Sequence, residues 1–154
     1  MEKDCGAWIN LLSRMVKKRL NTTLQGLGIT AIQSRVIFYI LDHYQQQPVF
    51  QRDIESAFQL SRSTATGILQ QLEKKGILRR ESVASDARLK SLVPTEQAAE
   101  LGCQVCACLR QTEQVLTRGL SDGQVQLFRE TLAAMADNLQ QAELSEAAPG
   151  VPAP

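Results

Sequence analysis

The chain has 154 residues, 44% hydrophobic and 21% charged, which is the composition of one globular domain long enough to bury a core. It contains no apolar run of about eighteen residues that could span a membrane, and acids precede its first apolar residues, the wrong order for a signal peptide. Its net charge of +1 is unevenly distributed along the chain. Basic residues outnumber acidic ones by six to two over 1–35 and by eight to five over 52–90. From residue 96 onward, acidic residues outnumber basic ones by eight to three. The first two of these segments can therefore face an anion.

Three helices are expected before residue 60. The first runs from about 5 to 24, with apolar residues at helical spacing: Trp8, Leu11, Leu12, Met15 and Val16. The second begins at Thr30, which can form a capping box with Gln33. A short third helix over 51–58 directs three side chains inward: Ile54, Ala57 and Phe58.

The stretch LSRSTATGILQQLEKKG (60–76) joins a small polar start to an amphipathic helix with Ser61 as its N-cap and Gly76 at its end. One buried stripe follows the cap: Ala65, Ile68, Leu69 and Leu72. Short hydroxyl side chains let a helix backbone approach the DNA major groove, and Arg62 has the forked donors that suit guanine or a phosphate. Capping alone explains Ser61 but does not require three further hydroxyls: Ser63, Thr64 and Thr66.

From 77 to 93 the apolar period approaches two and ASDA supplies a turn, so a β-hairpin is expected. It carries four cations: Arg79, Arg80, Arg88 and Lys90. Arg88 follows the turn and could enter a narrow minor groove, held extended by Asp86. Taken alone, the turn is explained equally well as a solvated one, because Asp and Ser are common turn formers. A short helix, a tight turn, a second helix and a hairpin make a helix-turn-helix with a wing.

The linked pattern resembles the MarR family of multiple-antibiotic-resistance regulators. It consists of Leu60-Ser61, LEKKG at 72–76, Arg80 and Asp86-Ala87-Arg88, and the similarity extends from about Trp8 to Leu139. The resemblance implies a homodimeric winged helix-turn-helix regulator that a small ligand, a metal or oxidation releases from double-stranded DNA. By position it implies DNA contacts from the recognition helix and the wing: Ser61, Arg62, Ser63, Thr64, Thr66, Asp86 and Arg88. The chain departs from the family pattern after the wing, where Pro94-Thr95 leads to Ala98.

Two further helices are expected after the hairpin. Thr95 caps one that runs to about Arg118, and Ser121 with Gln124 forms a second capping box. The last helix has the three-and-four apolar repeat of a helix-packing seam: Val125, Phe128, Leu132, Met135 and Leu139. The seam could cover the chain's own core, but we favour packing across a two-fold axis.

Four cysteines, three of them in CQVCAC, do not resemble an extracellular disulfide framework, so a reduced cytoplasmic protein is expected. Cys103 and Cys106 share one helix face, but Cys108 points about 140° away from Cys103, so one helix cannot direct all three thiols at a metal ion. Core packing is the expected role of the cysteines, and no metal or other cofactor is predicted. Oxidation or soft-metal binding at Cys103 and Cys106 is the alternative.

These patterns predict a mainly α protein with a small β-hairpin wing, an α+β winged helix-turn-helix fold with dimerisation helices at both ends. The expected parts are an N-terminal dimerisation helix (1–28), a DNA-binding lobe (29–94, with recognition helix 61–75 and wing 77–93), C-terminal dimerisation helices (95–142) and a disordered tail (143–154).

The predicted function is a homodimeric DNA-binding transcription regulator, a ligand-responsive repressor that reads a palindromic operator and has no membrane partner. Five aromatic or imidazole side chains could line a small-molecule pocket, with core packing as the alternative: Trp8, Phe38, Tyr39, His43 and Tyr44. An enzyme is disfavoured because the chain has no glycine-rich phosphate loop and no hydrolase motif. A winged-helix protein-interaction module is disfavoured because it would not need to keep Arg62 and Arg88.

Overall fold

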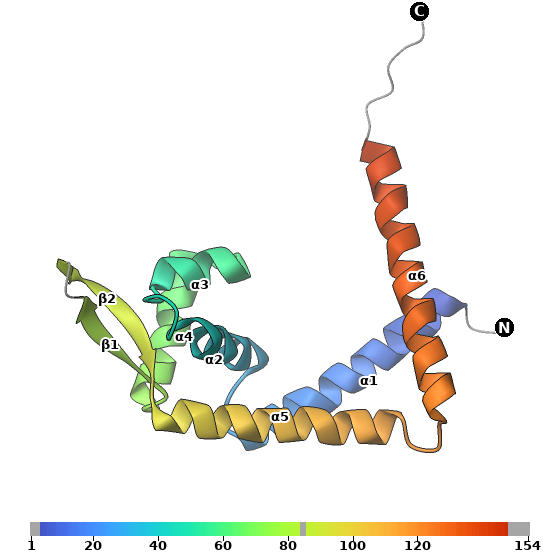
Figure 1. The fold of residues 1–154 in the computed structure, drawn as a ribbon, viewed down its shortest axis with the longest axis horizontal. Helices are drawn as coiled ribbons and strands as arrows, with labels where there is room; N and C mark the ends of the chain where they lie inside the picture. The colour runs from blue at the N-terminus through green and yellow to red at the C-terminus, as the bar shows by residue number, and fades with distance from the viewer. Residues whose placement is uncertain (1–3, 84–85, 148–154) are drawn as a thin grey trace, which may run out of the picture. The chain divides into compact units, whose positions relative to one another are not determined.

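The computed structural model describes residues 4–83 and 86–147, and over these residues the chain is mainly helical with one antiparallel hairpin (Figure 1). The elements are α1 (Cys5–Gly26), α2 (Ala31–His43), α3 (Gln51–Phe58), α4 (Arg62–Lys74), β1 (Leu78–Val83), β2 (Asp86–Pro94), α5 (Glu96–Leu116) and α6 (Asp122–Ala147). The predicted fold class is confirmed. The chain divides into two compact units, 1–113 and 114–154. The predicted lobe (29–94) lies wholly in the first unit together with α1 and most of α5.

Capping interactions determine where the first two helices begin. The Asp4 side chain accepts a hydrogen bond from the third residue of α1, Ala7, at 2.7 Å. In the predicted capping box of α2, Thr30 Oγ1 accepts from the Gln33 backbone N–H at 3.3 Å, and Gln33 Oε1 accepts from the Thr30 N–H at 3.1 Å. Both helices are confirmed, and α1 continues two residues past the predicted end, to Gly26.

The helix-turn-helix is formed by α3 and α4. The bounds of α3 match the prediction and Ile54 is fully buried, but Ala57, expected to face inward, is exposed. An eight-residue helix buries only a narrow stripe, and Ala57 lies about 60° around the axis from Ile54. The turn depends on Gln59, which adopts the left-handed conformation at φ 51°. The predicted start of α4, capped by Ser61, is confirmed.

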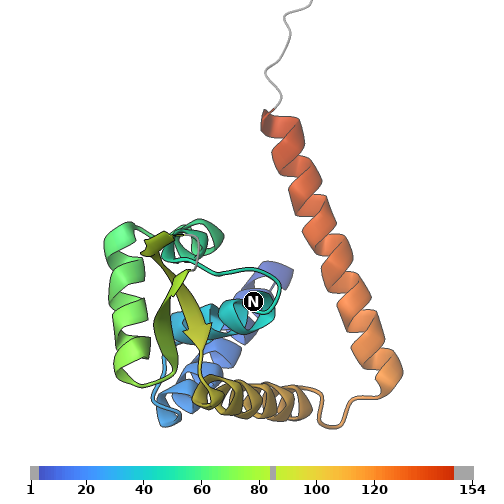
Figure 2. The same cartoon turned by 60° about the vertical axis from the view of Figure 1, so that its left-hand side comes forward.

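The core of the first unit draws side chains from every one of its elements. α4 supplies the predicted stripe, with Ala65, Leu69 and Leu72 at 0% exposure and Ile68 packed at the edge of the core. These side chains meet apolar residues of the other helices and the hairpin: Leu24, Val36, Ile40, Ile54, Leu78, Leu92, Ala98, Leu101 and Val105. Figure 2 shows α4 alongside β1, so burial of its apolar stripe leaves the polar stripe of the same helix exposed.

The wing is joined to the helix-turn-helix at its base. β1 and β2 pair regularly from Leu78 opposite Pro94 to Ser82 opposite Lys90, after which the register shifts and leaves a bulge over 87–89. At the base, the Leu92 N–H donates to the Val49 carbonyl at 2.7 Å. This bridge ties β2 to the segment that enters α3.

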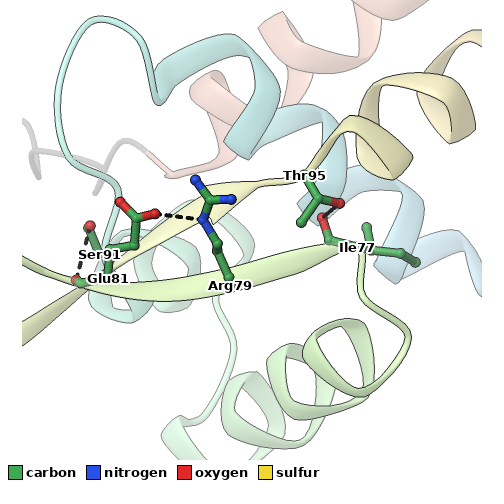
Figure 3. Close-up of polar contacts among 5 residues, drawn as sticks. All are labelled: Ile77, Arg79, Glu81, Ser91 and Thr95. Atoms are coloured by element: carbon green, nitrogen blue, oxygen red, sulfur yellow. Dashed lines mark hydrogen bonds and ion pairs between the residues drawn. The ribbon is translucent and has the colours of Figure 1, made fainter.

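Thr95 closes the junction between the wing and α5. Its hydroxyl donates to the Gly76 carbonyl at 2.7 Å and to the Ile77 carbonyl at 3.0 Å, and Figure 3 shows the contact with Ile77. The Thr95 N–H also donates to the Ile77 carbonyl, at 3.0 Å. This differs from the predicted role of Thr95 as the cap of α5, because its side chain satisfies carbonyls just beyond the end of α4. Pro94 is the last residue of β2, so the departure from the family pattern leaves both the strand and the following helix intact.

Two polar contacts tie the end of α4 to the start of α2 and to the turn that precedes it. Lys75 Nζ donates to the Gly28 carbonyl at 2.5 Å, and Gln33 Nε2 donates to Gln71 Oε1 at 2.7 Å. Gln33 is 2% exposed, so its amide is a buried polar group whose hydrogen bonds are costly to lose. The C-terminal half of α4 is therefore fixed to α2.

The second unit contains α6, which begins at the predicted capping box of Ser121 and Gln124. The helix continues to Ala147, so the predicted disordered tail is helical over 143–147, and 148–154 lie outside the described residues. Within the described residues no single helix is long and apolar enough to cross a membrane. α1 and α2 reach the necessary length and apolar composition only when they are taken together, as a pair bent by 74°.

Candidate nucleic-acid interface

The first turn of α4 carries linked hydroxyl groups. Ser61 Oγ accepts from the Thr64 N–H at 3.2 Å and lies 3.1 Å from Ser63 Oγ and 2.8 Å from Thr64 Oγ1. All three residues are exposed, at the helix end where backbone N–H groups and the positive end of the helix dipole favour anions. The structure therefore brings three of the predicted DNA-contacting hydroxyls together on one exposed turn.

Thr66, the fourth predicted hydroxyl, is turned toward α3 and is only half-exposed. Its Oγ1 donates to the Arg62 carbonyl at 2.8 Å and accepts from Gln51 Nε2 at 2.8 Å. Gln51 also donates to Glu55 Oε1 at 2.9 Å, so one amide joins the start of α3 to the first turns of α4. Thr66 thus helps to join the two helices, in addition to the DNA contact that the family resemblance implies for it.

An open hollow of about 480 Å³ lies between α3, α4 and the wing. Five of its ten lining residues are cationic: Arg52, Arg62, Arg80, Arg88 and Lys90. One carboxylate, that of Glu55, faces the same space. A concave surface lined by cations concentrates positive potential and attracts a phosphate backbone. This hollow is the candidate nucleic-acid interface.

The cations of the hollow differ in how firmly the protein holds them. Arg80 Nε pairs with Glu73 Oε2 at 3.3 Å, and the arginine side chain is only 27% exposed. Lys90 Nζ donates to Ser82 Oγ at 2.5 Å. Within the described part of the chain the Arg62 guanidinium makes no hydrogen bond or ion pair, so its donors are available to an incoming ligand.

Arg79 is a cation of the same hairpin that does not line the hollow. Successive side chains of a strand alternate between faces, and Arg79 shares its face with Glu81, to which its Nε is paired at 2.6 Å (Figure 3). The Glu81 carbonyl in turn accepts from Ser91 Oγ at 3.3 Å. Replacing Arg79 therefore removes a positive charge of the wing without changing the lining of the hollow, which makes Arg79 a control for the arginines that line it.

Arg88, the predicted wing arginine, lies in the bulge of β2, is exposed and lines the hollow. A bulge interrupts the alternation of side chains, which explains why three consecutive residues, 88–90, border the same space. The side chain of Asp86 and the turn residues 84–85 lie outside the described residues. The pairing of Asp86 with Arg88 therefore stays a prediction.

Two residues of α3, Gln51 and Arg52, belong to the site although the sequence did not single them out. The Arg52 guanidinium carbon lies 5.2 Å from the centroid of the Phe50 ring, and its side chain is 74% exposed. One arginine in a short helix is a weak signal by itself. The position of Arg52 at the start of α3 could have indicated a DNA contact, because the helix before the recognition helix crosses the DNA backbone in helix-turn-helix proteins.

The structure distributes the five predicted effector residues over several places. Trp8 is 56% exposed near the start of α1, and Tyr44 borders a hollow beside β2. Tyr39 stacks on His43 with ring centroids 4.2 Å apart, and His43 Nδ1 donates to the Tyr39 carbonyl at 2.7 Å. Tyr39 also meets Phe58 of α3 edge-on. The interpretation of Tyr39 and His43 as packing residues therefore gains support.

Phe38, the remaining candidate, lines a cavity of about 280 Å³ between α1, α2 and α5. The cavity is bordered mainly by apolar side chains: Leu20, Leu24, Ala31, Phe38, Val105 and Leu109. Lys17 and Arg35 add cations to its lining. Its volume is close to the lower end of ligand-binding sites, about 300 Å³.

All four cysteines are free. Cys103 is exposed, so the expected packing role is wrong for this residue, because it lies about 160° around α5 from the buried Val105. Cys106 and Cys108 are half-buried, and Cys108 lines the cavity between α1, α2 and α5. Among the residues that the structure describes, no three His, Cys, Asp or Glu side chains are grouped as metal ligands.

Rows of apolar side chains remain uncovered in each unit. α1 exposes four of them: Trp8, Ile9, Leu12 and Met15. In the predicted seam of α6, Phe128 is 50% and Leu139 is 69% exposed. Monomeric proteins seldom leave apolar rows of this kind in contact with water.

Comparisons with known proteins agree with this geometry. The sequence profile of the MarR family matches residues 27–89, which contain α2, α3, α4, β1 and the start of β2. Among solved structures, the fold is similar to that of MepR, a transcription regulator of the Staphylococcus aureus multidrug efflux pump MepA, with a TM-score of 0.81, 25% identity, and coverage of 89% of this chain and 99% of that chain.

Two further structures of S. aureus MepR are similar to the chain. One is a complex with DNA, at a TM-score of 0.67 and 26% identity, covering 89% of this chain and 99% of that chain. The other is bound to ethidium bromide, at a TM-score of 0.66 and 26% identity, covering 89% and 97%. Family profile, fold and cation-lined hollow agree: residues 27–89 match the MarR family, and the chain has the fold of a winged-helix DNA-binding transcription regulator.

Proposed function

We propose that the chain is a homodimeric, ligand-responsive repressor that acts in the cytoplasm on a palindromic operator. The observation that carries this proposal is the hollow between α3, α4 and the wing, where five cations surround the open N-terminal half of a recognition helix. A hollow of this charge suits a polyanion, and its position beside both reading elements suits duplex DNA better than a small anion.

In the proposed complex, α4 enters the major groove with its first turn foremost. Ser61, Ser63 and Thr64 donate to phosphates or base edges, and Arg62 provides the two parallel donors that match guanine O6 and N7. Arg88 extends from the bulge into the adjacent minor groove, with Asp86 as its proposed partner. Arg52 contacts the phosphate backbone from α3.

The dimer is proposed from the apolar rows on α1 and α6. Association of two copies would bury side chains that each unit leaves in water, and each fully buried Leu, Met or Phe adds roughly 1.5–3 kcal/mol. A two-fold dimer also presents two recognition helices to two half-sites whose centres lie about 10–10.5 base pairs apart.

The proposed signal is a small apolar molecule in the cavity between α1, α2 and α5, which Phe38 lines. The MepR structure with ethidium bromide supports the idea that a regulator of this fold can bind a small aromatic molecule. Oxidation at Cys103 and Cys106 is the competing signal. If peroxide releases DNA from the parent protein but not from a Cys103→Ser/Cys106→Ser double variant, the thiols are the sensor and the small-molecule proposal fails.

Footprinting on the DNA next to the gene tests the proposed function. We expect a protected inverted repeat with half-site centres about one helical turn apart. The Arg62→Ala variant, which should remain folded, serves as the control and should lose the protection. A footprint without a repeat, or equal protection of every sequence at moderate salt, contradicts the proposal.

A further inference from the structure

Glu55 places a negative charge in the hollow between α3, α4 and the wing. Among the described residues that line this hollow it is the one carboxylate, and it is half-buried on α3. It shares the lining with five cations: Arg52, Arg62, Arg80, Arg88 and Lys90. A carboxylate repels phosphate, so a surface that only has to attract DNA is weakened by it.

The cations of the hollow do not neutralise this charge. Within the described residues Glu55 forms no ion pair, and the nearby arginines that do form ion pairs use other carboxylates: Asp53, Glu73 and Glu81. Glu55 Oε1 accepts one hydrogen bond, from Gln51 Nε2 at 2.9 Å. A neutral amide leaves the carboxylate its full charge, and about three of its four lone-pair sites stay open to a further donor.

The carboxylate lies next to the recognition helix. The same Gln51 Nε2 donates to Thr66 Oγ1 of α4 at 2.8 Å, so one amide holds the Glu55 carboxylate and the Thr66 hydroxyl close together. In the major groove the exocyclic amino groups of cytosine and adenine donate hydrogen bonds, and a carboxylate accepts from cytosine N4. Phosphates carry only acceptor oxygens. A base can therefore satisfy this carboxylate and a phosphate cannot.

We propose that Glu55 is a specificity-determining residue for DNA. Its charge opposes sequence-independent attachment of the hollow to phosphates, and this cost is offset where an exocyclic amino group of the operator, cytosine N4 or adenine N6, donates to the carboxylate. A charge left unpaired with the wrong partner is an established way to discriminate between ligands. The proposal rests on the proposed function and deepens it, because it names the chemistry by which operator and bulk DNA are distinguished.

Fluorescence anisotropy of the full-length protein on a random-sequence duplex tests the first part. Glu55→Gln removes the charge and keeps an oxygen that can accept from Gln51. We expect it to bind the random duplex about three- to tenfold more tightly than the parent, with a slope of log affinity against log salt steeper by up to about 0.9 for each half-site. Glu81→Gln is the matched control, because it removes the same charge from the pair with Arg79, outside the hollow. It should stay within about twofold of the parent, since salt screens charges that lie farther from the DNA.

The operator duplex tests the second part. Operator affinity of Glu55→Gln should not rise, because the variant loses a base contact as it loses a repulsion, so the ratio of operator to random affinity should fall at least about threefold. Operator duplexes with cytosine or adenine replaced at single positions identify which amino group the parent reads. An equal rise in affinity for both duplexes overturns the proposal, as does a rise in Glu81→Gln as large as that in Glu55→Gln.

Glu55→Ala separates this role from a purely structural one. If Glu55 only orients Gln51, Glu55→Ala weakens binding to both duplexes while Glu55→Gln changes neither, and that pattern also overturns the proposal. We expect Glu55→Ala to bind the random duplex more tightly than the parent, as Glu55→Gln does. The random-duplex measurement needs no operator, so the absence of a protected repeat counts against the proposed function, whereas an unchanged random-duplex affinity of Glu55→Gln counts against the role of Glu55 alone.

Discussion

Replacing Arg62 by alanine should weaken operator binding strongly while leaving the fold unchanged. The guanidinium is exposed, lines the hollow and makes no hydrogen bond or ion pair within the described residues, so folding loses almost nothing, within about 0.5 kcal/mol. In the complex, a bidentate contact to guanine contributes about 1–3 kcal/mol for each half-site. A palindrome has two such contacts, so the dimer should lose about 2–6 kcal/mol, which is roughly thirtyfold or more in the dissociation constant.

Arg79→Ala is the matched control for this experiment. It removes the same charge, but from the wing face where Arg79 pairs with Glu81, and loss of an exposed pair costs about 0–1 kcal/mol of stability. Fluorescence anisotropy with an operator duplex, and with duplexes changed at each base pair, measures both variants. We expect Arg79→Ala to stay within about threefold of the parent and Arg62→Ala to lose its preference at one position of each half-site. Equal losses in the two variants would show that net charge, not the position of Arg62, determines affinity.

Three other predictions use different measurements. Arg88→Ala should weaken binding and reduce the slope of log affinity against log salt by about 0.9 for each phosphate that the variant no longer neutralises, and an unchanged dissociation constant at two salt concentrations would eliminate that role. Gln59→Gly should raise the free energy of unfolding, measured in urea, by about 0.5–1 kcal/mol, because the left-handed backbone at φ 51° is strained for glutamine. The Gln59→Ala control should not be more stable than the parent. Equal stability of the two variants would contradict this explanation. Met135→Glu should shift sedimentation equilibrium toward monomer while the off-seam Ala134→Glu should not, and a dimer unaffected by Met135→Glu would remove α6 from the interface.

The elements of the fold were predictable where local chemistry determines them. The capping boxes at Thr30 and Ser121, the cap at Ser61 and the buried stripe of α4 depend on residues three or four positions apart, so the sequence states them directly. Thr95 shows the limit of this reasoning. A threonine before a helix is an ordinary cap, but here its hydroxyl donates to carbonyls eighteen and nineteen residues earlier, a choice that only the tertiary structure determines.

The residues of the candidate site were predictable where they belong to a sequence motif. They were not predictable where the exposure of a side chain depends on residues far away in the sequence. Arg62 and Arg88 lie on the expected elements and line one hollow, as their positions in the motif indicated. Thr66 could not be assigned from helical spacing, because its exposure depends on Gln51, fifteen residues away on another helix. The five candidate effector residues do not line one cavity, because an aromatic residue type does not reveal the direction of its side chain. Tyr39 meets Phe58 of α3 and stacks on His43, whereas Phe38 lines the cavity between α1, α2 and α5.

The recognition helix is fixed at both ends, by Gln51 near its start and by Gln71 and Lys75 near its end. Rotating α4 within the lobe would break the buried hydrogen bond between Gln33 and Gln71, at a cost of about 1–3 kcal/mol, whereas displacing the lobe together with the turn at Gly28 breaks none of these contacts. In a dimer, the change that requires the least free energy from an effector is therefore a change in the distance between two rigid lobes. Because half-site centres are about 34–36 Å apart, a displacement of a few ångströms puts one helix out of register with its groove, and release of DNA needs no change in the reading surface itself.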